Sequence, residues 1–202
     1  MKNEFVVRDG ISRCDWANTH PLLAAYHDQE WGTPLFDDDR LFEMLSLDCF
    51  QAGLSWLTIL KKREAFIRAF SHFNIHEVSG FSPHVIPVLM QNPGIVRNRL
   101  KIPAIIDNAR IALEVQKEFG SFSSYIWQFS EGKPIINRWK SQQEIPATSK
   151  VSDAMSRDMK KRGFRFAGST ICYAFMQSIG MVNDHLVSCF RHQALPGNAR
   201  KF

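Results

Sequence analysis

The sequence lacks any long apolar run and contains few cysteines. None of its 202 residues lies in an uninterrupted apolar stretch of about 18 residues, the length expected of a membrane-spanning helix. Residues 1–5 include Glu4 and lead into no apolar core, which argues against a secretory signal peptide. Four cysteines in such a chain suggest packed thiols or metal ligands rather than disulfides. We expect a cytoplasmic protein.

Internal repeats and long linkers are also missing, strand signals are weak, and period-3.6 patterns dominate. Three acids at residues 37–39 favour a helix start, and Leu41, Met44, Leu45 and Asp48 follow with helical spacing. We therefore expect an all-α fold of about eight to ten helices. Helices are predicted over residues 37–53, 55–70, 82–92, 102–120, 121–129, 152–162, 169–179 and 183–191, with 130–150 an extended surface loop.

Two prolines fall within these helical patterns. Pro87 lies inside the helix predicted for residues 82–92, where proline removes a backbone donor and clashes with the preceding turn. That helix therefore either starts late or is broken. Pro103 lies near the start of the next helix and is expected in its first turn.

The charge balance is basic, at +5, and the chain holds 16 phenylalanines and five tryptophans. A basic surface suits a polyanionic partner such as nucleic acid, because each neutralised phosphate releases counterions. Mild basicity is also common in cytoplasmic proteins that bind no nucleic acid. Most of the aromatic residues should form the core, which leaves some free to stack on a ligand.

Two pairs of potential metal ligands lie near opposite ends of the sequence. Twelve residues separate Cys14 from His27, and three separate His185 from Cys189, which places the second pair on one face of the helix predicted there. Two thiolates and two imidazoles would form a closed tetrahedral site, which favours structural zinc. Each of these residues taken alone is better explained as a packed thiol or an ordinary histidine, and Cys49 and Cys172 are interpreted as core residues.

Asp48 lies on an apolar helical stripe, where a carboxylate is costly unless it has partners. It either bonds a neighbouring backbone group or faces a pocket as a buried acceptor. The aromatic residues Trp16, Tyr26, Trp31 and Trp56 fall in the first third of the chain. They are either core residues or the walls of a site that holds an extruded, cationic base.

Together these segments resemble the DNA-3-methyladenine glycosylase I family. The resemblance runs from Arg13 to Cys189. It is carried by RCDW (13–16), PLLAAYHDQEWG (21–32), LFEMLSLDCFQAGLSWLTILKKRE (41–64), NPGIVRNRLKIPAIIDNAR (92–110) and KKRGFRFAGSTICYAFMQSIGMVNDH (160–185).

The resemblance implies a helix-hairpin-helix glycosylase fold, with one structural zinc ion joining the terminal segments. It implies a single unit over residues 1–202, with a helical core at 37–120 and a zinc-clasped part at 10–36 and 150–190. The implied partner is double-stranded alkylated DNA, the implied oligomeric state is a monomer, and the implied reaction is hydrolytic excision of 3-methyladenine. Its implied sites are zinc ligands (Cys14, His27, His185, Cys189), a catalytic acid (Asp48), base-binding residues (Trp16, Leu23, Tyr26, Trp31, Trp56) and DNA contacts (Gly53, Leu54, Gly94, Arg97, Arg99, Lys101).

The chain departs from the family pattern inside the implied pocket. The family typically has Glu at position 48, and aspartate is one methylene shorter, so its carboxylate reaches about 1.5 Å less far. Leu23 replaces a frequent tyrosine, and Phe50 and Cys49 are unusual at their positions. These differences leave open a non-catalytic or altered-specificity homologue that binds damaged DNA, with the pocket partly closed by Phe50. A third hypothesis is a hydrolase that uses the zinc cluster catalytically.

Overall fold

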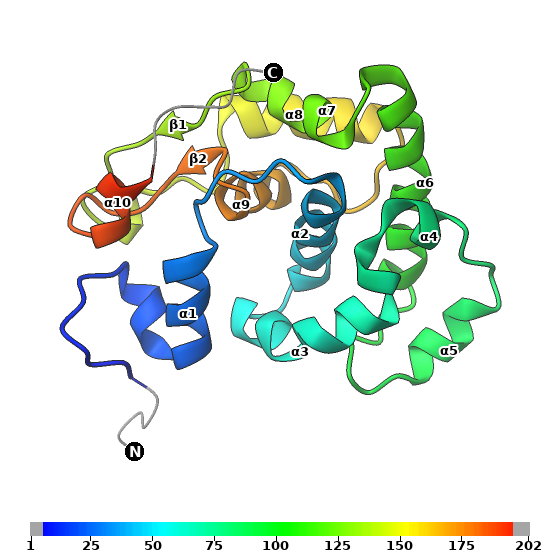
Figure 1. Cartoon of the computed structure of the whole chain (residues 1–202), viewed down its shortest axis with the longest axis horizontal. Coiled ribbons are helices and arrows are strands. Elements are labelled where there is room, and N and C mark those ends of the chain that lie inside the picture. The colour runs from blue at the N-terminus through cyan, green and yellow to red at the C-terminus, as the bar shows by residue number, and fades with distance from the viewer. Residues whose placement is uncertain (1–5, 196–202) are drawn as a thin grey trace.

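The structure is a computed structural model that describes residues 6–195, so the expectation about residues 1–5 lies outside it. The described chain is mostly helical, with two short strands (Figure 1). Its α-helices are α1 (Pro21–Gln29), α2 (Asp38–Gln51), α3 (Trp56–Ala69), α4 (Ile75–Ser79), α5 (Val85–Gln91), α6 (Lys101–Phe119), α7 (Phe122–Trp127), α8 (Lys150–Lys161), α9 (Ser169–Ser178) and α10 (Phe190–Ala194). Short 3-10 helices η1 (Asp15–Thr19), η2 (Ser71–Phe73), η3 (Gln128–Ser130) and η4 (Gln142–Glu144) accompany them. The all-α expectation is confirmed, and none of these helices has the length and apolarity to span a bilayer.

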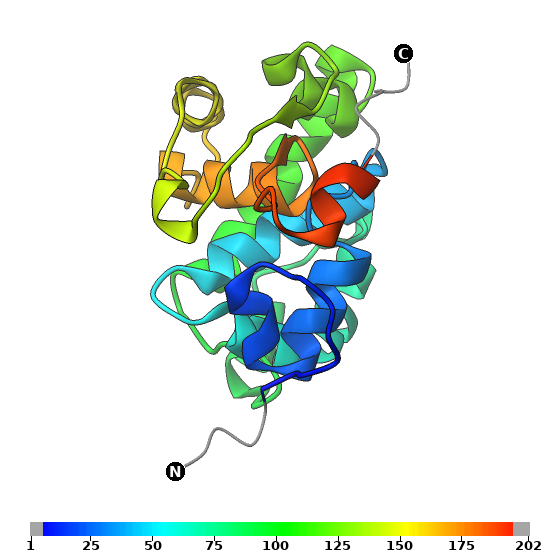
Figure 2. The same ribbon diagram turned by 90° about the vertical axis from the view of Figure 1, so that its left-hand side faces the viewer.

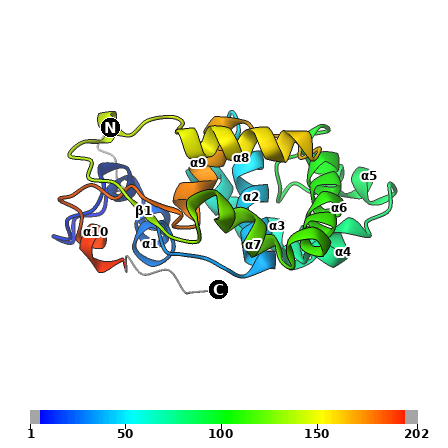
Figure 3. The ribbon, with the colours of Figure 1, turned by 90° about the horizontal axis from the view of Figure 1, so that it is seen from above.

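Helix α2 lies at the centre of the molecule and contacts α3, α6, α7 and α9 (Figures 1 and 3). The side chain of Asp37 caps its N-terminus by accepting from the amide of Arg40 at 2.9 Å. Every residue from Leu41 to Phe50 is buried. A helix buried on all sides forces its polar residues, Glu43, Ser46 and Asp48, to find partners inside the protein or to face a cavity.

The two prolines do not break their helices. Pro87 is the third residue of α5, and Pro103 is the third residue of α6. The amide of that position has no partner within a helix, so proline removes nothing there. The first pattern therefore corresponds to a helix that starts late, at Val85, and residues 92–100 connect α5 to α6.

The helix predicted for residues 183–191 is wrong. A two-residue strand, β2 (Val182–Asn183), pairs in parallel with β1 (Ile135–Ile136), and α10 begins only at Phe190. The carboxylate of Asp184 accepts hydrogen bonds from Asn137, Trp139, Tyr173 and Gln177 at 2.7–2.8 Å. These long-range bonds hold the segment around Asp184 in an extended conformation. The surface loop expected at residues 130–150 is also not continuous, because it contains β1 and η4.

The terminal segments of the described chain meet. The amide of Phe190 donates to the carbonyl of Ser12 at 2.9 Å, and the hydroxyl of Ser12 donates to the carbonyl of Ser188 at 2.7 Å. Figure 2 shows α10 and the loop before it lying next to the N-terminal segment. Helix α8 starts one turn earlier than predicted, because Ser149 is its N-cap and Ser152 completes a capping box.

The side chain of Lys101 caps the C-terminus of α2 and does not face solvent. Its ammonium donates to the carbonyls of Phe50 at 2.9 Å and Ala52 at 2.6 Å, and the residue is only 6% exposed. Carbonyls at a helix C-terminus lack partners within the helix, and a cation there also suits the helix dipole. The structure thus gives Lys101 a capping role at α2, and its contact with phosphate stays a prediction.

We expect Lys101→Met to lower the free energy of unfolding by about 1–3 kcal/mol, because two buried carbonyls lose a charged donor. Chemical denaturation measures this. The control is Lys117→Met, which removes an exposed lysine paired with Glu114 and should cost less than about 0.5 kcal/mol. Equal stability of the two variants would contradict the capping role.

Candidate functional site

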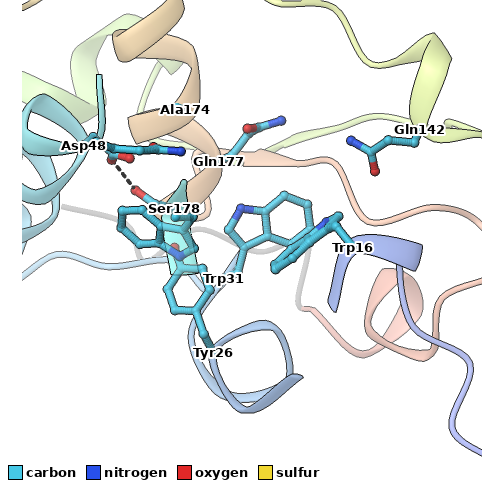
Figure 4. A pocket seen from close by; sticks show the side chains of 10 residues that line it. Trp16, Tyr26, Trp31, Asp48, Gln142, Ala174, Gln177 and Ser178 are labelled. Atoms are coloured by element: carbon cyan, nitrogen blue, oxygen red, sulfur yellow. Dashed lines mark hydrogen bonds between the residues drawn. The ribbon is translucent and has the colours of Figure 1, made fainter. Parts of the chain in front are cut away.

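A cavity of about 160 Å³ opens between α1, α2 and α9 (Figure 4). An enclosed space of about 150 Å³ can hold one benzene ring, so this open cavity suits a single flat heterocycle. The lining residues are Trp16, Tyr26, Trp31, Asp48, Gln51, Trp56, Gln142, Ala174, Gln177 and Ser178.

Four aromatic side chains form the walls, and the structure brings them together from four places in the sequence. Trp16 comes from η1, Tyr26 from α1, Trp31 from the turn after α1 and Trp56 from the first turn of α3. The Trp16 and Trp31 rings meet edge to face at 5.1 Å, and those of Tyr26 and Trp56 are tilted at 5.2 Å. The ring set is rigid because each member packs against another, and it offers π faces to a ligand.

Asp48 is the buried acid of this cavity. It is 2% exposed, and within residues 6–195 its only hydrogen-bond partner is the hydroxyl of Ser178, at 3.2 Å. Burial raises the pKa of Asp48 to about 8, which the Ser178 hydrogen bond lowers only partly. Among the described residues no lysine or arginine lines the cavity, so no cationic side chain there offsets the cost of ionising Asp48.

Several lining residues were missed by the sequence reasoning. Ala174, Gln177 and Ser178 have i, i+3, i+4 spacing on α9, and two of them are polar residues that follow a mainly apolar stretch from Ile171 to Met176, which was the available signal. The amide nitrogen of Gln177 donates to Asp184 at 2.8 Å. Because a carboxylate can only accept, this bond fixes the amide and leaves its carbonyl oxygen for the cavity.

Leu23 and Phe50 do not line the cavity. Leu23 is 8% exposed on α1 and is not among the lining residues. Phe50 packs against Phe66 and Phe70, with ring centroids 4.5 and 5.7 Å apart, on another side of α2. The suggestion that Phe50 closes the pocket is therefore wrong, because successive residues of a helix point in different directions.

The residues predicted to contact DNA lie on two loops. Gly53 has φ +81° and Leu54 is 42% exposed, between α2 and α3. Gly94 lies against α3, where an added Cβ would approach the Cβ of Ala65 to 2.8 Å. Arg97 and Arg99 are exposed and form no ion pair within the described chain. The first loop thus presents an apolar tip to solvent, and the second presents two cations that form no ion pair within the described chain.

A second cluster holds the four predicted metal ligands, all buried, with ligand atoms within 4.8 Å of one another. Nε2 of His27 lies 3.2 Å from Nδ1 of His185, and Sγ of Cys189 lies 3.4 and 3.5 Å from these atoms. Sγ of Cys14 is 3.8 Å from Nδ1 of His185. Ligands of tetrahedral zinc lie about 3.3–3.8 Å apart, given Zn–N and Zn–S bonds of about 2.0 and 2.3 Å. These residues therefore fit a closed metal site.

The outer contacts of the cluster also fit. Nδ1 of His27 is 2.8 Å from a carboxylate oxygen of Asp28, and Nε2 of His185 is 3.1 Å from the carbonyl of Trp31. Such partners orient metal-binding imidazoles. The pKa of the Cys189 thiol is strongly lowered, first by the hydrogen bond with Cys14. His185 and Cys189 sit on a turn instead of the predicted helix, and the backbone there brings them together just as well.

Comparison with known proteins identifies the family of this chain. The model of the methyladenine glycosylase family matches residues 16–192, and the chain belongs to that family. It is 45% identical to DNA-3-methyladenine glycosylase 1 of Escherichia coli (strain K12), over 93% of this chain and 99% of the relative. It is 45% identical to DNA-3-methyladenine glycosylase of Haemophilus influenzae (strain ATCC 51907 / DSM 11121 / KW20 / Rd), over 88% and 96%.

A solved structure of a variant 3-methyladenine DNA glycosylase I in complex with 3-methyladenine has a TM-score of 0.88 and 34% identity to this chain. The match covers 92% of this chain and 99% of that one. The resemblance stated from sequence is thereby confirmed, and so is the helical glycosylase fold.

The raised pKa of Asp48 predicts a pH-dependent stability. Since the pKa of Asp48 is about 8 in the folded chain and its ordinary value is 3.8, the folded chain retains a proton that the unfolded chain releases between these pH values. Stability from this group is complete at low pH and is lost as pH rises through about 8.

Asp48→Asn should therefore stabilise the protein by roughly 2–3 kcal/mol more at pH 9 than at pH 6. Urea denaturation at both pH values measures the difference, and Asp107→Asn controls for loss of an exposed carboxylate. An Asp48→Asn effect independent of pH would contradict a neutral buried acid.

Proposed function

We propose that the protein is a monofunctional DNA glycosylase that excises 3-methyladenine from alkylated double-stranded DNA by hydrolysis of the N-glycosidic bond. One observation carries the proposal: a buried acid without a cationic partner faces a cavity walled by aromatic rings. The names of the relatives support the same substrate.

The cavity suits an N3-alkylated adenine better than adenine itself. The alkylated nucleotide carries a positive charge, and a stacked cation is attracted both to aromatic faces and to an ionised carboxylate. Asp48 would accept the exocyclic N–H of the extruded base and compensate its charge. Tyr26, Trp16 and Trp31 would shape the slot, with Trp56 as the stacking platform. Neutral adenine gains neither interaction fully and is bound less tightly.

The reaction does not require a strong nucleophile from the protein. A cationic base is already a good leaving group, so water can serve as nucleophile once the nucleotide is extruded and oriented. No lysine is among the lining residues, so nothing in the cavity offers a Schiff base. Asp48 remains the acid that recognises the base and stabilises its charge, and we assign it the catalytic role.

The two exposed loops would hold the duplex. Leu54, carried by Gly53, is placed to fill the space that the extruded base leaves. The turn at Gly94, with Arg97 and Arg99, would bind phosphates through backbone amides and unpaired cations. Cavity and cluster are assembled from one chain, which supports action as a monomer.

We also propose one structural zinc ion, held by Cys14, His27, His185 and Cys189. Four protein ligands leave no position for water or substrate, so the ion would supply folding energy and no step of the reaction. It would close nearly the whole chain into a loop, which restricts the unfolded state.

Incubation with methylated double-stranded DNA should release free 3-methyladenine, quantified by chromatography. Asp48→Asn should lower kcat/KM by about 100- to 1000-fold, the range for losing one preorganised charge contact in an active site. Asp107→Asn should match the native protein. Recovery of no 3-methyladenine would overturn the enzymatic assignment and favour a DNA-binding homologue.

The purified protein should contain one zinc per chain by elemental analysis, and Cys189→Ser should lose it. Loss of the ion should lower the free energy of unfolding by about 4–5 kcal/mol, by analogy with a long-loop cross-link. Cys172→Ala, which alters a buried thiol outside the cluster, should keep the metal. A metal-free protein of unchanged stability would argue against the structural role, and a well-folded but inactive one would favour catalytic zinc.

A further inference from the structure

Within residues 6–195, Ser178 is the one side chain that forms a hydrogen bond with the carboxyl group of Asp48. It is the last residue of α9, is 6% exposed and turns its hydroxyl toward α2 (Figure 4). Its Oγ lies 3.2 Å from Oδ2 of Asp48 and 2.8 Å from the carbonyl oxygen of Phe175, one turn earlier in α9. The hydroxyl therefore sits between two oxygen atoms.

Counting hydrogens at these three oxygens gives two consistent arrangements. A carbonyl can only accept, so at Phe175 the hydroxyl must use its single hydrogen as donor. The contact with Asp48 then needs a hydrogen from the acid, which is neutral in this arrangement. If Asp48 is ionised, the Ser178 hydrogen turns to Oδ2 instead.

The carbonyl of Phe175 tolerates either arrangement. It also accepts the amide of Ile179 at 3.0 Å, so it keeps one hydrogen bond when the hydroxyl turns away. The Phe175 carbonyl is therefore not left without a partner in either arrangement, so it does not lock the Ser178 hydroxyl in one orientation. The Ser178 hydroxyl can thus change its hydrogen-bond acceptor when Asp48 gains or loses a proton.

The other groups around Asp48 do not decide its charge. The titratable side chains that interact electrostatically with Asp48 are Tyr26 on α1, Cys49 on α2 and Cys172 on α9. All three are neutral at pH 7 because burial raises their pKa values. The pKa of about 8 leaves about one tenth of Asp48 ionised at pH 7. A cationic base must therefore draw the acid into its ionised form.

We propose that Ser178 is a positioning residue that serves both protonation states of Asp48 and so sets the pH range in which the pocket accepts a cationic base. This inference rests on the proposed function. When the base enters, the proton of Asp48 passes to water, and the Ser178 hydrogen moves from the Phe175 carbonyl to Oδ2.

The direction of the effect follows from hydrogen-bond strength. A bond donated to a carboxylate is about twice as strong as one between neutral groups, so Ser178 favours the ionised acid. Ser178→Ala should raise the pKa of Asp48 by about 0.5–1 pH unit. Ser178→Thr keeps the hydroxyl and should restore the native value.

The direct test is a ¹³C NMR titration of protein labelled at aspartate carboxyls, which needs no enzymatic activity. Asp48→Asn identifies the resonance, and we expect a midpoint near 8 in the native protein and a higher one in Ser178→Ala. Ser156→Ala is the matched control, because its buried hydroxyl also bonds a backbone carbonyl, that of Ala167, away from Asp48. An unmoved or lowered midpoint in Ser178→Ala would overturn the proposal.

The second test is the pH profile of kcat/KM on methylated DNA. The ascending limb should shift upward in Ser178→Ala, with activity at pH 7 reduced about three- to tenfold and recovered at high pH. A loss equal at every pH would show a merely structural role and would overturn the proposal. If the native protein releases no base, the proposed function fails, while the NMR titration still decides the role of Ser178.

Discussion

An acid held inside the protein without a cationic partner is the constraint on which the site depends. Taking a carboxylate out of water is costly, and Asp48 has only the Ser178 hydroxyl in return. The fold tolerates it because the acid can stay protonated, as its raised pKa indicates. A ligand that brings positive charge relieves the strain, so the same desolvation that penalises ionisation in the free protein gives the cavity its preference for a cation.

Contacts at the C-terminal end of α2 and along one flank of the helix fix the position of Asp48. At the C-terminal end of the helix, Lys101 binds the carbonyls of Phe50 and Ala52. On its flank, α9 brings Ser178 to Asp48 and Gln177 to the cavity, and Asp184 in turn holds Gln177. The rigid elements thus place the acid, while the exposed loops are left for the duplex.

The cavity and the Cys2His2 cluster share a wall. The ring of Trp31 lines the cavity, and its carbonyl is 3.1 Å from Nε2 of His185. The ring centroids of Trp31 and His185 are 4.5 Å apart. Gly32 has to be small here, because an added Cβ would lie 2.8 Å from Nε2 of His185. A structural ion in the cluster would therefore also stiffen one side of the base pocket.

The sequence by itself determined what depends on local pattern and on residue type. Helical periodicity and the caps located α2, α3, α6 and α9, and the unusual acid at 48, the aromatics and the four ligand types stand out in a single chain. Tertiary structure decided what depends on partners distant in sequence. Lys101 caps the carbonyl end of another helix, the long-range bonds of Asp184 hold an expected helix as a strand end and a loop, and Phe50 packs in the core. Ser178 met Asp48 only because α9 packs across α2, since a contact between residues 130 positions apart leaves no trace in local sequence.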